Sequence, residues 1–180
     1  MLTITGGKLT TWRRMAKQTV DRLVEREGRE APCHTAEIPL GMEARAEDLE
    51  APDGVGEEAL EQLAFRYGHA ARQVLDLTRK DPRLAEPIVP GRPDLLAEAV
   101  IAARHEQART VADVLLRRTR LGLLAAPQLR DDGPARAVAN AMGGELGWSR
   151  REVKRAAEAW PAAAVEAGID PAGSPVEPLQ

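Results

Sequence analysis

A diglycine turn followed by a lysine is the segment of this sequence best suited to chemistry. Gly6, Gly7 and Lys8 come after residues 2–5, which alternate apolar and hydroxyl side chains, and before a helical pattern. A helix N-terminus carries about half a positive charge and attracts anions or electron-rich carbonyls. Glycines let a flat ligand approach the backbone closely, and Lys8 adds a full charge. From the residues alone, both a ligand-binding turn and an ordinary strand-to-helix turn stay open.

Other residues capable of chemistry favour structural roles. Residues 54–59 match a relaxed GxGxxA pattern, but no strand precedes them and acids stand where a pyrophosphate would bind. His34, His69 and His105 are scattered without metal-ligand spacing. Cys33 has no base and orienting partner near it in sequence. We therefore assign no catalytic residue and no metal site.

The basic run at residues 117–120 has three interpretations. It could contact nucleic acid, a membrane or partner, or it could form the salt-bridged C-terminal end of a helix, with Asp113 four residues before Arg117. The structural interpretation is favoured, and contact with a membrane or partner stays open. The net charge of -3 argues against a nucleic-acid partner, since such domains are usually strongly basic.

Composition limits the kind of protein this is. A length of 180 residues fits one domain, or one domain with a short extra piece. Hydrophobic residues make up 43% but aromatic residues only 3%, so the core must consist of small side chains. The single cysteine excludes an intrachain disulfide. With no apolar run near the roughly 18 residues of a membrane span and no signal peptide, we expect a cytoplasmic protein.

The apolar spacing predicts an all-α fold of about six or seven helices. Two capping boxes mark helix starts, at Thr110 with Asp113 and at Ser149 with Glu152. Val138, Met142 and Leu146 recur every four residues, as on one face of a helix. The helices are expected over residues 10–27, 57–67, a short stretch around 74–75, 93–105, from 110 onward, 134–146 and 149–168.

Residues 2–5 are predicted to be the end of a β-strand with no partner strand in this sequence. Because a lone strand is not stable, its hydrogen bonds must come from another polypeptide or from a missing N-terminal region. We therefore expect the chain to be the C-terminal part of a longer protein. Its parts are then residues 1–28 with the strand, turn and first helix, a connecting segment 29–56, a helical domain 57–168, and a flexible tail 169–180.

Several segments resemble one enzyme family. Residues 5–13, TGGKLTTWR, resemble the end of the flavin domain of FAD-dependent glycerol-3-phosphate dehydrogenases and the related glycerophosphate oxidases. Residues 99–108 and 113–120 resemble the two-helix corner of that family's C-terminal helical domain. Residues 65–68 and 148–149 fit less specifically. The resemblance covers nearly the whole chain.

The resemblance implies a cofactor-contacting turn. It places Gly6, Gly7, Lys8, Leu9 and Thr10 against the flavin ring of FAD, with the helix N-terminus directed at the edge where negative charge gathers on reduction. A fixed positive potential there would stabilise the anionic reduced flavin. Lys8 is also expected within reach of the substrate phosphate.

The implied function is that of part of a flavoenzyme. The intact enzyme would oxidise sn-glycerol 3-phosphate to dihydroxyacetone phosphate and pass electrons to quinone or oxygen. The family's N-terminal FAD-binding domain, with its GxGxxG turn, is not in this sequence, so we expect that domain as the partner. The chain alone is then expected to bind no FAD and to be inactive. Peripheral membrane or quinone contact stays open for the intact enzyme.

A second function class stays open beside the first. The chain could be a free-standing helical protein-interaction module, with or without the ability to reassemble with a separate flavin domain. The unpartnered strand at residues 2–5 motivates this alternative, because it offers an edge to a partner sheet.

Overall fold

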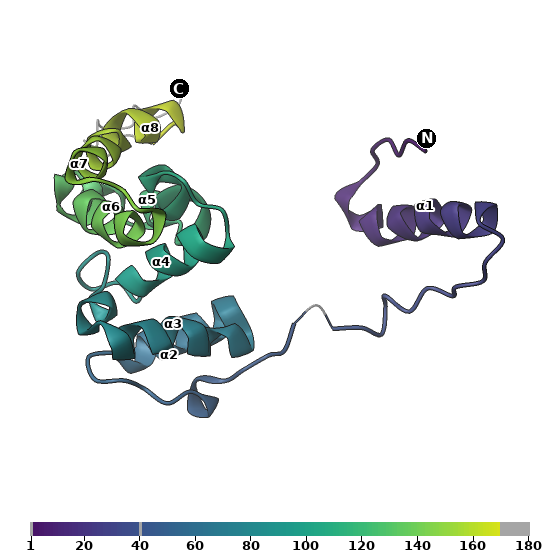
Figure 1. Ribbon diagram of the computed structural model, residues 1–180, viewed down its shortest axis with the longest axis horizontal. Coiled ribbons are helices and arrows are strands. Elements are labelled where there is room, and N and C mark those ends of the chain that lie inside the picture. The colour runs from purple at the N-terminus through teal and green to yellow at the C-terminus, as the bar shows by residue number, and fades with distance from the viewer. Residues whose placement is uncertain (1, 40, 170–180) are drawn as a thin grey trace, which may run out of the picture. The chain divides into compact units, whose positions relative to one another are not determined.

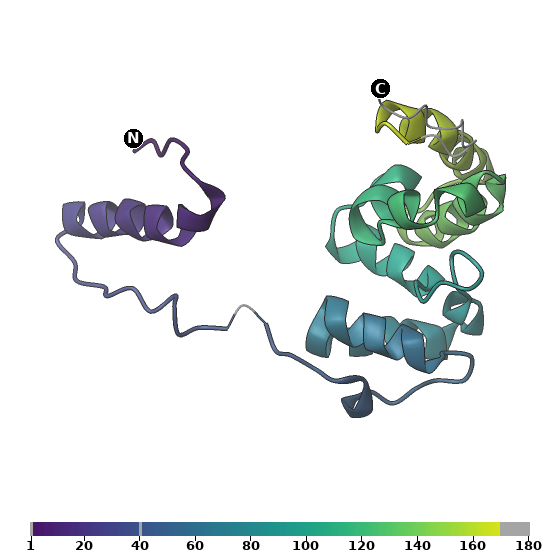
Figure 2. The same cartoon turned by 180° about the vertical axis from the view of Figure 1, so that it is seen from behind.

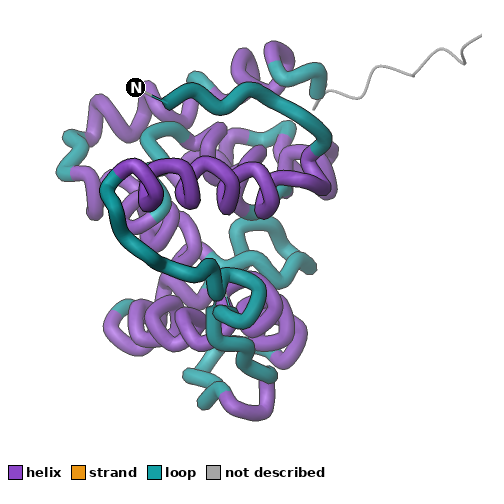
Figure 3. The backbone as a smooth tube through the Cα atoms, turned by 90° about the vertical axis from the view of Figure 1, so that its right-hand side faces the viewer, coloured by secondary structure: helices purple, strands orange, loops and turns teal. Residues whose placement is uncertain are grey.

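The computed structural model describes residues 2–39 and 41–169. The chain divides into two compact units, Met1–Met42 and Glu43–Gln180, and each is described by itself. In the described ranges all regular structure is helical, which confirms the predicted all-α fold (Figure 3). The division falls within the predicted connecting segment 29–56. Apart from Ile169, the predicted tail 169–180 lies outside the described residues.

The first unit consists of a short 3₁₀ turn, η1 (Leu9–Thr11), and the helix α1 (Trp12–Arg26). As predicted, Gly28 terminates the helix just after its last turn, with a φ of +64°. The Gly28 amide donates to Glu25 O at 3.0 Å and the Arg29 amide to Val24 O at 3.1 Å, a Schellman motif. No residue of α1 is buried, so the first unit has no core of its own along this helix.

The predicted strand at residues 2–5 is not formed. Among the described residues of both units no strand is present that could pair with it. A β-strand exists through ladder hydrogen bonds to a neighbour, and alternation of side chains cannot replace them. The expectation of a stray N-terminal strand in this chain is therefore wrong.

The second unit contains a pair of helices near its start, joined by a short turn. After η2 (Ala46–Asp48), the helix α2 (Glu57–Tyr67) ends at Gly68, where φ is +53°, and η3 (Gly68–Ala70) leads into α3 (Ala71–Lys80). A further 3₁₀ turn, η4 (Pro82–Ala85), follows. The apolar faces of both helices form one core with part of the next helix, and its members include Leu60, Leu63, Val74, Leu75, Val100 and Ile101.

The central helix α4 (Leu96–His105) is buried on every side. All residues from Leu96 to Ala103 are buried, as expected of a helix that is apolar all round. In the second unit it lies between the α2–α3 pair and the later helices (Figures 1 and 2). It begins at Leu96 and not at Pro93, because the Glu98 carboxylate accepts the Leu95 amide at 2.9 Å and caps the helix there.

A corner follows α4, as the sequence predicts. The Thr110 and Asp113 capping box is formed: the Thr110 amide donates to Asp113 Oδ2 at 3.0 Å and the Asp113 amide to Thr110 Oγ1 at 3.1 Å. The helix that starts there becomes a π-helix, η5 (Asp113–Arg118), because the Thr119 amide and hydroxyl both donate to Val114 O. The short α5 (Leu121–Leu124) and η6 (Ala126–Leu129) come next.

The last helices complete the second core. They are α6 (Asp132–Leu146), α7 (Arg150–Glu158) and α8 (Trp160–Glu166). The Ser149 capping box is confirmed. The single helix predicted over 149–168 is two helices, because Pro161 lies in the first turn of α8 and has no amide hydrogen to continue the ladder. Trp160 and Met142 are among the largest fully buried side chains.

Candidate functional site

The predicted cofactor turn is a single continuous surface at the start of α1. Lys8 has an extended backbone, with φ of -67° and ψ of 141°, and its carbonyl is the first acceptor of η1. The Thr11 amide donates to Lys8 O at 2.9 Å and the Thr11 hydroxyl at 2.8 Å. Gly6, Gly7, Lys8, Leu9 and Thr10 are all exposed.

A shallow depression of about 340 Å³ lies beside this turn. Gly6, Gly7, Lys8 and Leu9 line it, and Thr10 does not. The remaining lining comes from Ile4 and Thr5 and from α1, through Trp12, Met15 and Ala16. The structure therefore brings four of the five predicted residues to one depression with mainly apolar neighbours.

The electrostatics of the turn are positive. Neither η1 nor α1 has an acidic residue in its first turn, so no carboxylate of these turns offsets the partial charge of the helix N-terminus. Within the described residues Lys8 forms no ion pair. The guanidinium of Arg13 is engaged elsewhere: it donates to Thr35 O and lies 5.3 Å from the Trp12 ring centroid. Lys8 is thus the cation that the turn offers to a ligand.

The two glycines have different surroundings. A Cβ on Gly7 would lie 3.3 Å from Met15 Sδ and 3.4 Å from Thr11 Oγ1, so Gly7 packs closely against α1. A Cβ on Gly6 would meet no atom within 4 Å. The fold itself therefore favours glycine at position 7, whereas a small side chain at position 6 would be limited only by what approaches from outside.

The other residues considered from sequence do not gather into a site. In the part of the chain that the structure describes, no three histidine, cysteine or carboxylate side chains are placed to hold a metal ion. Cys33 is exposed, and its thiol forms a hydrogen bond of 3.2 Å with the Thr35 hydroxyl, which lowers the pKa of the thiol. Arg117 pairs with Asp113 at 2.9 Å, as the structural interpretation of the basic run predicts.

A buried ion cluster between α2 and α4 was not predicted. Arg66 Nη2 lies 2.8 Å from Asp94 Oδ1, and Arg66 Nη1 pairs with Glu98 Oε2. The Tyr67 hydroxyl donates to the same Glu98 oxygen at 3.1 Å. Glu98 is 0% exposed and Asp94 3% exposed. The sequence marks residues 65–68 only by their resemblance to the family. No local pattern indicates that Arg66 pairs with Glu98, 32 residues away.

The cluster perturbs the acid–base properties of its members. Burial raises the pKa of the Glu98 carboxyl, and the charge of Arg66 opposes that rise. Burial, followed by the negative charge of Glu98, raises the pKa of Tyr67 and keeps the phenol protonated. Every hydrogen-bonding group of the cluster that faces the interior has a partner, so the arrangement is suited to fastening two helices.

Comparison with known proteins identifies the family. The family model described as the C-terminal domain of alpha-glycerophosphate oxidase matches residues 2–153. The chain belongs to this family. The matched range includes the turn at residues 6–10 and the corner between α4 and η5, so the family resemblance stated from the sequence is confirmed.

Curated proteins that are similar to this chain include glycerol-3-phosphate dehydrogenases. The Synechocystis enzyme is 36% identical over 131 residues, 69% of this chain and 24% of that protein. Glycerol-3-phosphate dehydrogenase 2 of Mycobacterium bovis is 32% identical over 163 residues, which are 86% of this chain and 28% of that protein. The probable glycerol-3-phosphate dehydrogenase, mitochondrial, of Caenorhabditis elegans is 35% identical over 166 residues, which are 84% of this chain and 22% of that protein.

The chain spans about a quarter of the length of these relatives. No solved structure matches it.

Proposed function

We propose that this chain supplies the C-terminal helical domain and the flavin-facing turn of an enzyme that oxidises sn-glycerol 3-phosphate to dihydroxyacetone phosphate. Electrons would pass from the flavin to quinone or oxygen. Family membership and the dehydrogenase relatives support the reaction class. The observation that carries the site is the Gly6–Lys8 turn at a helix N-terminus without a neighbouring acid.

The turn suits one edge of a flavin. Bound FAD would accept a hydride from the substrate carbon. The amides at the start of η1 and the Lys8 ammonium supply a fixed positive potential, whose stabilising effect on the ring grows as the ring gains negative charge. The absence of a side chain at Gly6 allows the ring to approach the backbone. Lys8 would also attract the dianionic phosphate of the substrate.

The chain by itself offers only one wall of such a site. A depression of about 340 Å³ is at the small end of ligand pockets, which enclose most of their ligand's surface. We therefore propose that an N-terminal FAD-binding domain is the partner that encloses the cofactor. The isolated chain is proposed to bind no FAD and to be inactive, and no catalytic residue is assigned in it.

A chimera tests the proposal. The region of the Synechocystis dehydrogenase that this chain matches is replaced by this chain, and bound flavin and glycerol-3-phosphate-dependent dye reduction are measured. We expect both in the chimera and neither in the isolated chain. A folded chimera without flavin, or an isolated chain that holds flavin and reduces the dye, would contradict the proposal.

Lys8→Met in the chimera tests the turn itself, with Lys17→Met as the matched control. Lys17 lies on α1, the helix that follows the turn, and pairs with Asp21 at 2.5 Å. Removing an electrostatic group aimed at developing charge costs about 10²–10³ in rate, so we expect a loss of that order for Lys8→Met and little change for Lys17→Met. Equal activities of the two variants would exclude a role for Lys8.

An interaction module remains the second candidate, for a different reason from the one that the sequence suggested. The strand that motivated it is not formed, but α1 buries none of its residues and exposes Trp12, Val20 and Leu23. These side chains fit a helix that completes its packing on another polypeptide. The module hypothesis predicts stable binding to a flavin domain without restored dye reduction.

In the part of the chain that the structure describes, no helix is both long and apolar enough to cross a bilayer. A cytoplasmic location, with membrane or quinone contact in the intact enzyme, is proposed from the sequence alone.

A further inference from the structure

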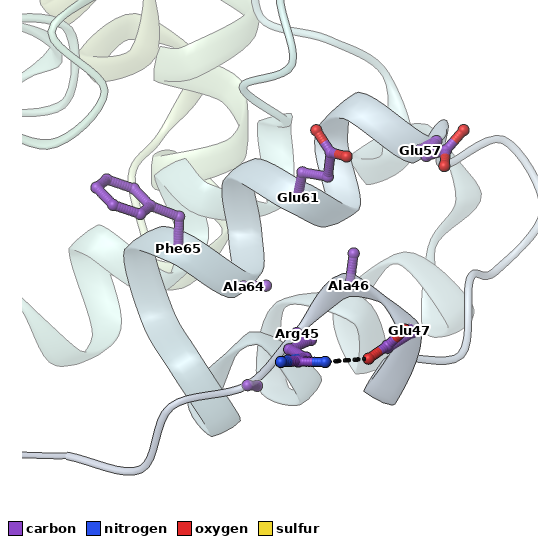
Figure 4. Close-up of a pocket in the computed structure, with 8 residues that line it drawn as sticks. Arg45, Ala46, Glu47, Glu57, Glu61, Ala64 and Phe65 are labelled. Carbon is purple, nitrogen blue, oxygen red and sulfur yellow. Dashed lines mark hydrogen bonds and ion pairs between the residues drawn. The ribbon is translucent and has the colours of Figure 1, made fainter.

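One exposed stripe of the second unit is acidic and ends in an aromatic ring. Glu57, Glu61 and Phe65 recur every four residues along α2 and line a groove of about 520 Å³ (Figure 4). Phe65 is 89% exposed, although it is the only phenylalanine of the chain. We call these three residues the acidic stripe.

A second groove in the same unit is basic and has an apolar floor. It has a volume of about 560 Å³ and lies between α6 and α7. Of its lining residues, Trp148, Val153 and Gly143 are buried or half-buried and form the floor, whereas Arg150 and Lys154 are exposed and form the rim. We call this the basic groove. Arg136, Asn140 and Gly144 of α6 complete its lining.

Arg136 in the basic groove pairs with Asp132, but other charges of the two surfaces lack a close partner within the described chain. Among the described residues, Glu57, Glu61 and Arg150 form no ion pair, and Lys154 reaches Glu158 only at 3.6 Å. Each surface also places like charges four residues apart on a helix, which destabilises it. An oppositely charged partner would relieve both costs.

We propose that the acidic stripe of one molecule docks in the basic groove of a second copy. The two charge pairs have the same spacing, one i to i+4 step. In an antiparallel register Glu57 lies opposite Lys154 and Glu61 opposite Arg150. One further step along α2 brings Phe65 past the start of α7, to Trp148. The aromatic ring then covers the apolar floor of the basic groove, and the ion pairs flank it.

The contact is head-to-tail because the two surfaces lie on different parts of the second unit. The acidic stripe is on α2 and the basic groove on α6 and α7, which Figures 1 and 2 show on opposite sides of α4. Each molecule can therefore use both surfaces at once, and association is open-ended or closes into a ring. Ion pairs at an exposed rim also make the association sensitive to salt.

Sedimentation equilibrium of the full chain tests the proposal. We expect the weight-average mass to rise with concentration between about 10 µM and 1 mM, and to fall toward the monomer when salt is raised from about 0.05 to 0.5 M. Glu61→Arg and Arg150→Glu should each weaken association about tenfold, and the double variant should restore it. Phe65→Ala should also weaken association, and because the Phe65 side chain is exposed, the variant should keep the fold.

Mixing single variants tests whether the acidic stripe and the basic groove contact each other. Glu61→Arg keeps an intact basic groove and Arg150→Glu keeps an intact acidic stripe, so an equimolar mixture should associate more tightly than either variant alone. Glu30→Lys, an exposed change in the first unit, serves as the charge control and should associate as the wild type does. A monomeric wild type at every concentration, or wild-type association in both single variants, would overturn the proposal.

Discussion

Arg66 holds two carboxylates that water hardly reaches, and its loss should be costly. Arg66→Met leaves Asp94 and Glu98 buried without a cation, and removal of one partner of a buried ion pair typically costs about 3–5 kcal/mol of unfolding free energy. Tyr67→Phe removes a single hydrogen bond and should cost about 1 kcal/mol. Urea unfolding followed by circular dichroism measures both. Arg72→Met, a change at an exposed arginine of α3, is the control. An equal loss of unfolding free energy in this variant would show that the cluster does not stabilise the fold.

The stability deficit of Arg66→Met should depend on pH. Burial already raises the pKa of Glu98 above its usual value, and loss of the opposing Arg66 charge raises it further. A carboxyl with a raised folded pKa stabilises the fold while it is protonated, below its unfolded pKa, and this contribution is lost as pH rises through the folded pKa. The deficit should therefore be small near pH 4 and large near pH 8. A deficit that does not change over this range would show that Glu98 is not the responsible group.

The neighbouring glycines of the turn should respond differently to alanine. Gly6→Ala meets no atom of the chain, so α1 should keep its helicity while flavin retention by the chimera falls. Gly7→Ala presses on Met15 Sδ at 3.3 Å and should perturb the turn even without a flavin. Circular dichroism of the isolated chain and flavin content of the chimera separate the two effects. Undiminished flavin in Gly6→Ala would contradict the proposed close approach.

Among the elements, the crossing of α6 and α7 depends on one glycine. A Cβ on Gly143 would lie 2.7 Å from Val153 Cγ2, so Gly143→Ala should lower the unfolding free energy by about 1–3 kcal/mol. Gly144, its neighbour, has nothing within 4 Å, and Gly144→Ala should raise stability by up to about 1 kcal/mol. Thermal unfolding distinguishes these opposite signs. A higher unfolding free energy for both variants would contradict the prediction, because α6 and α7 could then move apart to accept a Cβ at position 143.

Local signals predicted the elements well and their long-range contacts poorly. Gly68 ends α2 where the apolar pattern stops, and the Thr110 and Ser149 capping boxes start helical turns, because these signals act within a few residues. The π-helix depends on the Thr119 hydroxyl reaching Val114 O, which no periodicity indicates. The Arg66 cluster joins residues about thirty positions apart. For the turn at Gly6, local chemistry left two interpretations open, and only family resemblance suggested a flavin.

At the scale of the whole molecule, the connection between the units should be open to proteases. Residues 27–39 are all exposed and no helix crosses the division after Met42. Trypsin should cut first at Arg29 and Arg45 and leave a resistant fragment that contains α2 to α8. Mass spectrometry of a time course locates the cuts. Early cleavage between α2 and α8 would place the boundary elsewhere than the predicted segment 29–56.

The second unit should lose its structure in a single step. Leu95 and Ala97 belong to the core with α2 and α3, whereas Leu96 and Ala99 belong to the core with α6 to α8, so both cores share α4 as a common wall. Neither can melt without exposing one side of that wall to water. A substitution that destabilises one core should therefore destabilise the other core as well. The backbone amides of α4 should be the last to exchange with solvent deuterium.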